Sequence, residues 1–213
     1  MGIYVGNKRY ALFVGSTRRK VAEKGLPYDA EIEYLETSGT QWINTNYYPN
    51  TNTVIETTVR FLDRNIGYLL GSNYSNSGGQ DNFYFQLYNN IIWAGAGNAQ
   101  SNNLGNVSVD NTTNYDITLK GEGYLKVNNT TKSRASGGVL CNDPMYIFTR
   151  NNLASIGQQS FRLFSFKISE NNVTMMDFIP VRKGTIGYMY DKVSGTLFGN
   201  SGTGNFTLGP DKN

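Results

Sequence analysis

Three glutamates near the start of the main body, Glu31, Glu33 and Glu36, come nearest to a catalytic pattern. Retaining hydrolysis of a glycosidic bond needs two carboxyl groups about 5–5.5 Å apart across the sugar. On a β-strand Glu31 and Glu33 share one face, whereas Glu36 falls on the other face unless a bulge intervenes. Charges of this kind are also typical of an edge strand that must avoid pairing with another molecule. We therefore expect a protein that is not an enzyme, with no catalytic residues.

The sequence contains no histidine and one cysteine, Cys141. Catalytic Ser-His-Asp and Cys-His sites, a histidine general base and a His-ligated zinc site are thereby excluded. No disulfide can form within the chain, and Cys141 is expected to be a small packing residue. Calcium needs six to eight oxygen ligands, and the only candidate loops, Asp110-Asn111 and Asn142-Asp143, are typical of turns. The sequence therefore predicts no metal site and no cofactor.

Aromatic and amide side chains offer a different chemistry, the binding of glycans. Aromatic rings stack on the apolar face of a sugar, and amides bond its hydroxyl groups. The segment 73–82 is the best candidate for a variable binding rim. The alternative is that the two tryptophans alternate into the core of a sandwich. The candidates for glycan binding are Tyr48, Tyr74, Asn76 and Trp93, in a chain that also supplies Trp42, Tyr47, Tyr84 and Tyr88.

Positive charge is concentrated at the N-terminus. Residues 1–25 hold six basic residues against Glu23, a net charge of +5, while the whole chain carries +3, so the other 188 residues carry −2. The body is not expected to bind nucleic acid, whereas the first segment can dock onto an acidic surface. The alternative is that these charges only solvate an exposed hairpin. The candidates for attachment are Tyr4, Lys8, Arg9, Phe13, Arg18, Arg19 and Lys20.

The same segment contains a repeat of nine residues, in which 3–9 align with 12–18. Each copy is a short apolar strand followed by Gly-Asn or Gly-Ser, which favour turns. A small β-hairpin or meander is predicted, and it needs a partner because so few strands bury too little apolar surface. Residues 21–28, which contain Pro27, are expected to be a linker. The predicted division is an attachment or oligomerisation segment at 1–28 and one domain at 29–213.

The rest of the chain has the pattern of an all-β protein. Short runs rich in β-branched and aromatic residues alternate with Gly, Asn and Asp clusters, and no run is apolar enough for a membrane span. Tight hairpin turns are expected at Asn89-Asn90, Glu122-Gly123 and Asn171-Asn172. Two stacked antiparallel sheets are therefore predicted. The expected strands are 30–36, 40–45, 53–62, 66–72, 82–88, 90–94, 114–120, 122–128, 144–149, 161–169, 173–181, 185–190 and 195–198.

Two groups of motifs stand at the ends of this body. The opening group is 34–45, followed by Tyr48-Pro49-Asn50, and the closing group comprises 177–182, 187–191, 195–198 and 202–206. With these motifs, the chain from Ile32 to Pro210 resembles the concanavalin-A-like or laminin-G-like jelly-roll domains of phage and prophage virion proteins of gut bacteria. The glutamate run at 31–36 bears a superficial similarity to the catalytic strand of laminarinase-type glycoside hydrolases, which share this broad fold.

Several motif residues have expected structural roles. Gly39 belongs to a turn that brings the first two strands together, and Trp42 lies in one of those strands. Because the first and last strands of a sandwich commonly lie side by side, 32–45 is expected near 161–181. Phe178 is expected to face the core or an interface, and Pro180 to end a strand. An ion pair between Arg182 and Asp191 should fix the last hairpins. Turns with unusual φ are expected at Gly187, Gly195 and Gly204.

The resemblance implies a structural protein of the virion: a head fibre, a capsid-decoration subunit or a tail-associated subunit. Its expected partners are other virion proteins of the capsid or tail, and a homo-oligomer is expected, a trimer by analogy. The protein would be made in the cytoplasm of the bacterial host and end in the virion. The alternative is a glycan-binding module that recognises the host surface.

Overall fold

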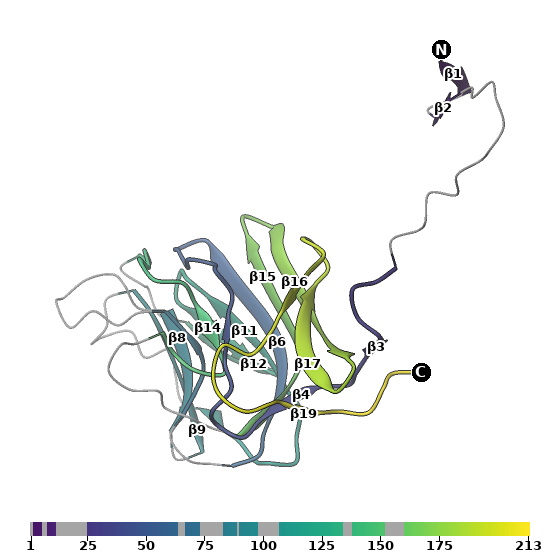
Figure 1. Ribbon diagram of the computed structural model, residues 1–213. Helices are drawn as coiled ribbons and strands as arrows, with labels where there is room; N and C mark the ends of the chain where they lie inside the picture. Colours follow the sequence, from purple (N-terminus) through teal and green to yellow (C-terminus); the bar gives the residue numbers. More distant parts are fainter. Residues whose placement is uncertain are drawn as a thin grey trace.

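The structure is a computed structural model that describes residues 2–5, 8–11, 25–63, 67–72, 83–88, 90–97, 107–133, 138–151 and 160–213. These residues form β-strands and no helix, and therefore no helix that could cross a membrane. All pairing between the strands is antiparallel, in one hairpin and two larger sheets (Figure 1).

The larger sheet has eleven strands, in the order β13-β12-β11-β6-β15-β16-β17-β18. β4 pairs with β15 on one side and β19 on the other, while β3 pairs with β16. The bounds are β3 (Ala30–Glu31), β4 (Leu35–Thr37), β6 (Thr53–Phe61), β11 (Tyr115–Lys120), β12 (Tyr124–Val127), β13 (Thr130–Ser133), β15 (Phe161–Glu170), β16 (Val173–Lys183), β17 (Ile186–Asp191), β18 (Thr196–Phe198) and β19 (Thr207–Leu208).

The smaller sheet has six strands, in the order β10-β9-β8-β7-β14-β5. None of these strands contains a charged residue. The bounds are β5 (Ile43–Asn44), β7 (Gly67–Gly71), β8 (Phe83–Tyr88), β9 (Ile91–Ala96), β10 (Val107–Ser108) and β14 (Tyr146–Ile147).

The core lies between the two sheets. Alternate residues of β6 point into it, and Ile55, Val59 and Phe61 are fully buried there. Phe61 stacks on Phe85 of the smaller sheet, with ring centroids 6.5 Å apart. A second contact joins Phe148, just after β14, to Phe161 of β15 at 4.7 Å. Because successive side chains of a strand point to opposite faces, this packing decides which side chains each sheet presents to the outside.

Most of the predicted strand pairing is confirmed. Lys120 pairs with Tyr124 across the Glu122-Gly123 turn, and Glu170 pairs with Val173 across the Asn171-Asn172 turn. Tyr88 pairs with Ile91 at the third predicted hairpin, although Asn89 lies outside the described residues. β3 and β4 lie beside the last strands as expected, since β4 pairs with β15 and β3 with β16. β5 does not, because Ile43–Asn44 pair with β14 in the smaller sheet, so the turn at Gly39 leads from one sheet to the other and does not pair the first two strands.

The N-terminal hairpin consists of β1 (Gly2–Val5) and β2 (Lys8–Ala11), paired in register from Gly2 opposite Ala11 to Val5 opposite Lys8. It forms a sheet of its own and pairs with no other described strand. Figure 1 shows it away from the sandwich. The Gly-Asn pair between the two strands and the second copy of the repeat lie outside the described residues.

Pro180 does not end a strand, so that prediction was wrong. It lies inside β16, where its carbonyl accepts a hydrogen bond from the Ile32 backbone N–H at 3.0 Å. The nitrogen and carbonyl of a strand residue face the same side, so the donor that proline lacks faces the edge strand β3 and its flank. Proline is tolerated in sheets at such edge positions.

The predicted ion pair between Arg182 and Asp191 was also wrong. Arg182 makes a bidentate contact with Asp211, at 2.7 Å from Nε and 2.6 Å from Nη2. Its carbonyl accepts from the Asp29 backbone N–H, so residues from both ends of the body meet at this point. Asp191 is buried and accepts instead from the backbone N–H groups of Asp177, Val193 and Ser194.

Gly187 was predicted to be a turn residue, but it lies inside β17. Gly195 and Gly204 do have the left-handed φ values that were expected, 71° and 72°, and Gly39 has a φ of 106°. The reason for glycine at 187 is close packing: a Cβ there would collide with the Leu35 side chain and lie 2.6 Å from Leu208.

Replacing Gly187 with alanine should therefore lower the free energy of unfolding by about 1–3 kcal/mol, the usual cost of overpacking a core. Gly25→Ala is the control, because a Cβ at Gly25 meets nothing within 4 Å. That variant should stay within about 0.5 kcal/mol of the parent. Denaturant titration of both variants measures the difference, and equal stability would mean that the core can absorb the methyl group.

Candidate functional site

The outer face of the smaller sheet, which points away from the larger sheet, carries a row of aromatic side chains. In β8, Phe83, Phe85 and Leu87 belong to the buried core, so the alternating residues Tyr84 and Tyr88 point outward. Tyr84 is largely covered, whereas 42% of Tyr88 is exposed. The outer face of β8, a central strand of the smaller sheet, is therefore aromatic.

Trp93 lies on the same face. Its neighbours in β9, Ile92 and Ala94, are fully buried in the core, and Trp93 itself is half-buried. Its ring meets Tyr88 edge to face, with centroids 6.3 Å apart. The alternative interpretation, in which Trp93 alternates into the core, is therefore wrong.

The middle of the row is formed by Tyr68 of β7 and Tyr84 of β8, whose ring centroids lie 5.9 Å apart. The Arg150 guanidinium carbon lies 4.5 Å from the Tyr68 centroid and 6.0 Å from the Tyr84 centroid, a cation–π arrangement. Gly95 lets Tyr84 lie close against β9, since a Cβ at that position would collide with the tyrosine ring.

Trp42 and Tyr146 form the other end of the row. Their rings stack at 4.3 Å, and Trp42 is partly buried against the core. Trp42 also joins the two motif groups through its backbone. Its backbone N–H donates to Asn200 Oδ1 at 3.1 Å, and its backbone carbonyl accepts from the Ser201 N–H at 2.8 Å. Tyr48 is 53% exposed. Burial, together with Asp143 and Tyr48 nearby, raises the pKa of Tyr146 above its ordinary value.

We call this row the aromatic face and keep the name below. It takes one or more rings from four neighbouring strands and from the residue that precedes β5. Its members are Trp42, Tyr68, Tyr84, Tyr88, Trp93 and Tyr146.

Sequence reasoning missed Tyr68, Tyr146 and Arg150 as members or neighbours of this face. Tyr146 had a usable signal, because it stands between two apolar residues, Met145 and Ile147, that are both fully buried. Tyr68 had a weaker one, because a register shift between Tyr68 and Leu70 breaks the alternation of β7. Arg150 follows β14 at a distance in sequence that gives no hint of its position over two tyrosines.

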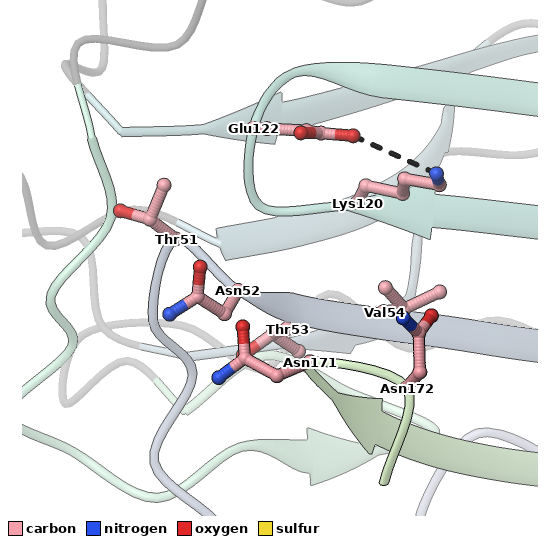
Figure 2. A pocket seen from close by; sticks show the side chains of 8 residues that line it. All are labelled: Thr51, Asn52, Thr53, Val54, Lys120, Glu122, Asn171 and Asn172. Atoms are coloured by element: carbon pink, nitrogen blue, oxygen red, sulfur yellow. Dashed lines mark ion pairs between the residues drawn. The ribbon is translucent and has the colours of Figure 1, made fainter.

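A polar hollow of about 200 Å³ lies elsewhere, at the end of the larger sheet. Three segments line it: the residues that lead into β6 with the first residues of β6, the β11–β12 turn and the β15–β16 turn (Figure 2). Lys120 and Glu122 form an ion pair at 3.6 Å on one side of it. The lining residues are Thr51, Asn52, Thr53, Val54, Lys120, Glu122, Asn171 and Asn172.

A hydrogen-bonded group lies close to this hollow and fixes its rim. One oxygen of Glu170 accepts from the Tyr47 hydroxyl and from Asn50 Nδ2, the latter at 2.8 Å. The Tyr47 hydroxyl also lies 2.7 Å from Thr53 Oγ1. Burial, followed by the hydrogen bond to Glu170, raises the pKa of Tyr47 far above its ordinary value. Tyr47 is therefore a neutral structural residue rather than part of a glycan site.

The outer face of the larger sheet differs from the aromatic face in being charged. Lys167 pairs with Glu56 at 3.2 Å, and Lys192 with Asp177 at 2.7 Å. Glu56, Lys167 and Asp177 border an open groove of about 370 Å³. Because they lie in ion pairs on an open surface, they contribute little to stability.

The glutamates that could have supported catalysis are not gathered into a site. Ile32 points into the core, so Glu31 and Glu33 on either side of it point away from the core. Glu36 is held by Arg162, whose Nε lies 2.7 Å from Glu36 Oε2. Arg162 in turn stacks on Tyr34 at 4.3 Å. Glu36 therefore has a structural role at the β4–β15 junction.

The remaining predicted site residues are only partly described. Tyr4 and Arg9 lie opposite each other in the N-terminal hairpin, and Lys8 lies opposite Val5, but only their backbone is described. Outside the described residues lie Phe13, Arg18, Arg19, Lys20, Tyr74 and Asn76. Their proposed roles in attachment and glycan binding remain predictions. Phe178 is buried in the core, as expected.

The Asp110 loop is a closed turn rather than a cluster of metal ligands. The carboxylate accepts from the backbone N–H groups of Thr112 and Thr113, both at 2.7 Å, and from both threonine hydroxyls. These bonds, led by the one from the Thr112 backbone, hold the pKa of Asp110 well below its ordinary value. In the described part of the chain, no three His, Cys, Asp or Glu side chains gather as metal ligands would.

Comparison with known proteins identifies the fold. No protein-family model matches the chain, and no curated protein does. Among solved structures, a native heptameric SAP-like pentraxin from Limulus polyphemus aligns with a TM-score of 0.52 and 14% identity, over 86% of this chain and 98% of that one. The chain is therefore a jelly-roll β-sandwich of the concanavalin-A-like kind, which confirms the predicted fold class. The comparison does not indicate a phage origin.

The Asp110 turn yields a test by pH. Because its folded pKa is depressed, the carboxylate contributes stability above the unfolded pKa of about 3.9, and that contribution is lost as the pH falls toward the folded pKa. Asp110→Asn keeps an acceptor without the charge. It should be less stable than the parent at pH 7, and the difference should shrink below about pH 4. Thermal unfolding between pH 7 and pH 2.5 measures this, and a difference that does not change with pH would contradict it.

Proposed function

We propose that this chain is a structural protein of a phage virion, attached by residues 1–28 and displaying its jelly-roll body. The observation that supports this most is the N-terminal hairpin, which pairs with no other described strand. An isolated two-stranded hairpin is marginally stable in water, so it gains most by packing on another molecule. Its basic charge suits an acidic surface on that molecule.

The body is proposed to have no catalytic role. Two acidic side chains of the body serve the fold: buried Asp191 binds three backbone N–H groups, and half-buried Glu170 binds Tyr47 and Asn50. The motif groups at both ends of the body, which resemble those of virion proteins, support the same proposal. Its place would be the head or tail of the particle after synthesis in the host cytoplasm.

The proposed partners are other virion proteins of the capsid or tail, and further copies of this chain. The pentraxin from Limulus is heptameric, so a sandwich of this fold can form an oligomer. A trimer is our proposal for this chain, because fibres and decorations of particles are usually symmetric. The hairpin is the segment through which copies would join.

The attachment proposal predicts that a chain lacking residues 1–24 folds but does not enter the particle. Its body should unfold at the same temperature as that of the full chain, because the hairpin pairs with no described strand of it. The measurement is the number of copies per purified particle, by quantitative mass spectrometry. As a control, Lys183→Gln removes one exposed positive charge from the body and should incorporate normally. Normal incorporation of the truncated chain would overturn the proposal.

A second candidate function is the recognition of glycans on a host surface, and the aromatic face favours it. Outward-facing tyrosines and tryptophans are the side chains that stack on sugars. Screening the full chain on an array of bacterial surface glycans tests this function. Binding of at least one glycan is expected, whereas no binding to bacterial glycans of any class would leave only the structural role.

A further inference from the structure

We propose that the aromatic face binds a neutral, extended glycan that lies across the strands of the smaller sheet. This inference rests on the second proposed function and specifies both the site and the class of ligand. Three properties of the face support it: its lack of charge, its unmatched polar atoms and the direction of its row of rings. The kind of side chains that it presents bears on whether a second copy of the chain could bind there instead.

The first property is the absence of charge. The six strands of the smaller sheet contain no charged residue, whereas the outer face of the larger sheet carries Glu56, Lys167 and Asp177. Arg150, beside the row, already lies over the Tyr68 and Tyr84 rings. Asp143, near Tyr146, has the opposite charge. An acidic polysaccharide or a nucleic acid would find no basic surface here, so the ligand that fits is neutral.

The second property is a pair of unmatched polar atoms. Trp93 Nε1 and Asn90 Oδ1 are both buried, and neither has a hydrogen-bond partner in the part of the chain that the structure describes. One atom is a donor and the other an acceptor, and they belong to residues three positions apart on the same β8–β9 hairpin. A hydroxyl group can accept from an indole N–H and donate to an amide oxygen. Buried polar atoms are rarely left without partners, and sugar hydroxyl groups would supply them once the side chains that cover these two atoms shift on binding.

The third property is the direction of the row. Its rings belong to β9, β8, β7 and β14 and to the residue before β5, which are consecutive neighbours in the sheet. Neighbouring strands are about 4.8 Å apart, so the row covers roughly 19 Å at right angles to the strands. A single sugar ring cannot contact all of it. The length suits a chain of several sugars that stacks on the rings at the two ends of the row, Trp93 and Tyr88 at one end and Trp42 and Tyr146 at the other. Between these ends the sugar chain would pass over Arg150, which covers Tyr68 and Tyr84.

A second copy of this chain is the other occupant to consider. Interfaces that join identical subunits permanently resemble a core cut in half and are more apolar than the rest of the surface, with aromatic residues enriched. Of the outward side chains in β8 and β9, only Ile91 is aliphatic, while Gln86 and Tyr88 carry polar groups that need partners. The composition therefore favours a sugar over another protein surface.

The test uses the full chain and two sets of probes: neutral oligosaccharides of glucose, mannose and galactose with five or more units, and alginate as an acidic polysaccharide. Calorimetric titration should show binding of at least one neutral probe, with a weaker response to its two-sugar fragment. Trp93→Ala and Tyr88→Ala should each weaken binding about tenfold, the loss expected when a stacking contact worth about 1.4 kcal/mol is removed. Trp93→Phe, which keeps a ring but lacks the N–H, should lose less.

Matched controls separate the site from the function. Tyr124→Ala changes a half-buried tyrosine of the larger sheet, and Asn171→Ala changes the polar hollow; both should bind normally. Thermal unfolding establishes that each variant is folded. If a neutral glycan binds equally well to Trp93→Ala and Tyr88→Ala, the site is wrong while glycan binding stands. If only alginate binds, the neutral class is wrong. If no probe binds, the inference fails, whereas the second proposed function is decided separately by the array of bacterial surface glycans.

Sedimentation of the same variants covers the remaining alternative. The aromatic face should have no influence on oligomeric state, so the parent, Trp93→Ala and Tyr88→Ala should sediment alike. Dissociation of an oligomer in the two aromatic variants, but not in Tyr124→Ala, would show that the face is a subunit contact and would overturn the proposal.

Discussion

The packing of two sheets face to face is the constraint on which the rest of the structure depends. Each strand of the smaller sheet has one face committed to the core, where Phe85 meets Phe61 and Phe148 meets Phe161. The period of two then sends every second residue outward. With the inward face supplying the burial, the outward face is free to be aromatic and uncharged. The alternation of side chains that builds the core therefore also places the rings of the aromatic face on the outside.

Segments from near the two ends of the body pack against each other and complete the larger sheet. β4 lies between β15 and β19, and the turn at 38–41 is held against residues 200–204. Gln41 is buried there and donates to the carbonyl of Thr203 at 3.2 Å. Gly202 lies so close to Trp42 that a side chain would not fit. The two motif groups that suggested the fold are therefore in direct contact, and each needs the other to be buried.

Local patterns in the sequence predicted much of this fold but little of the site. Alternation and turn residues placed most strands and the three predicted hairpins, because both depend on neighbours in sequence. The partner of Arg182 could not be found in this way: Asp191 was the nearer candidate in sequence, but its carboxylate faces inward to backbone N–H groups and Asp211 comes from the far end of the chain. Trp93 was predicted as a glycan-binding candidate from its residue type alone, whereas the face on which it lies depends on the inward position of Ile92 and Ala94. The stack of Trp42 on Tyr146 joins residues about a hundred positions apart, and no local pattern indicates it.

The contact of Arg182 with both ends of the body has a further consequence. The chain enters the sandwich at Asp29, whose backbone N–H donates to the Arg182 backbone carbonyl, and its last residues return to the same residue, because the Arg182 guanidinium donates to Asp211. Entry and exit therefore share one corner beside β16 (Figure 1). The N-terminal segment therefore leaves the body beside Asp211, at the place where β3 pairs with β16.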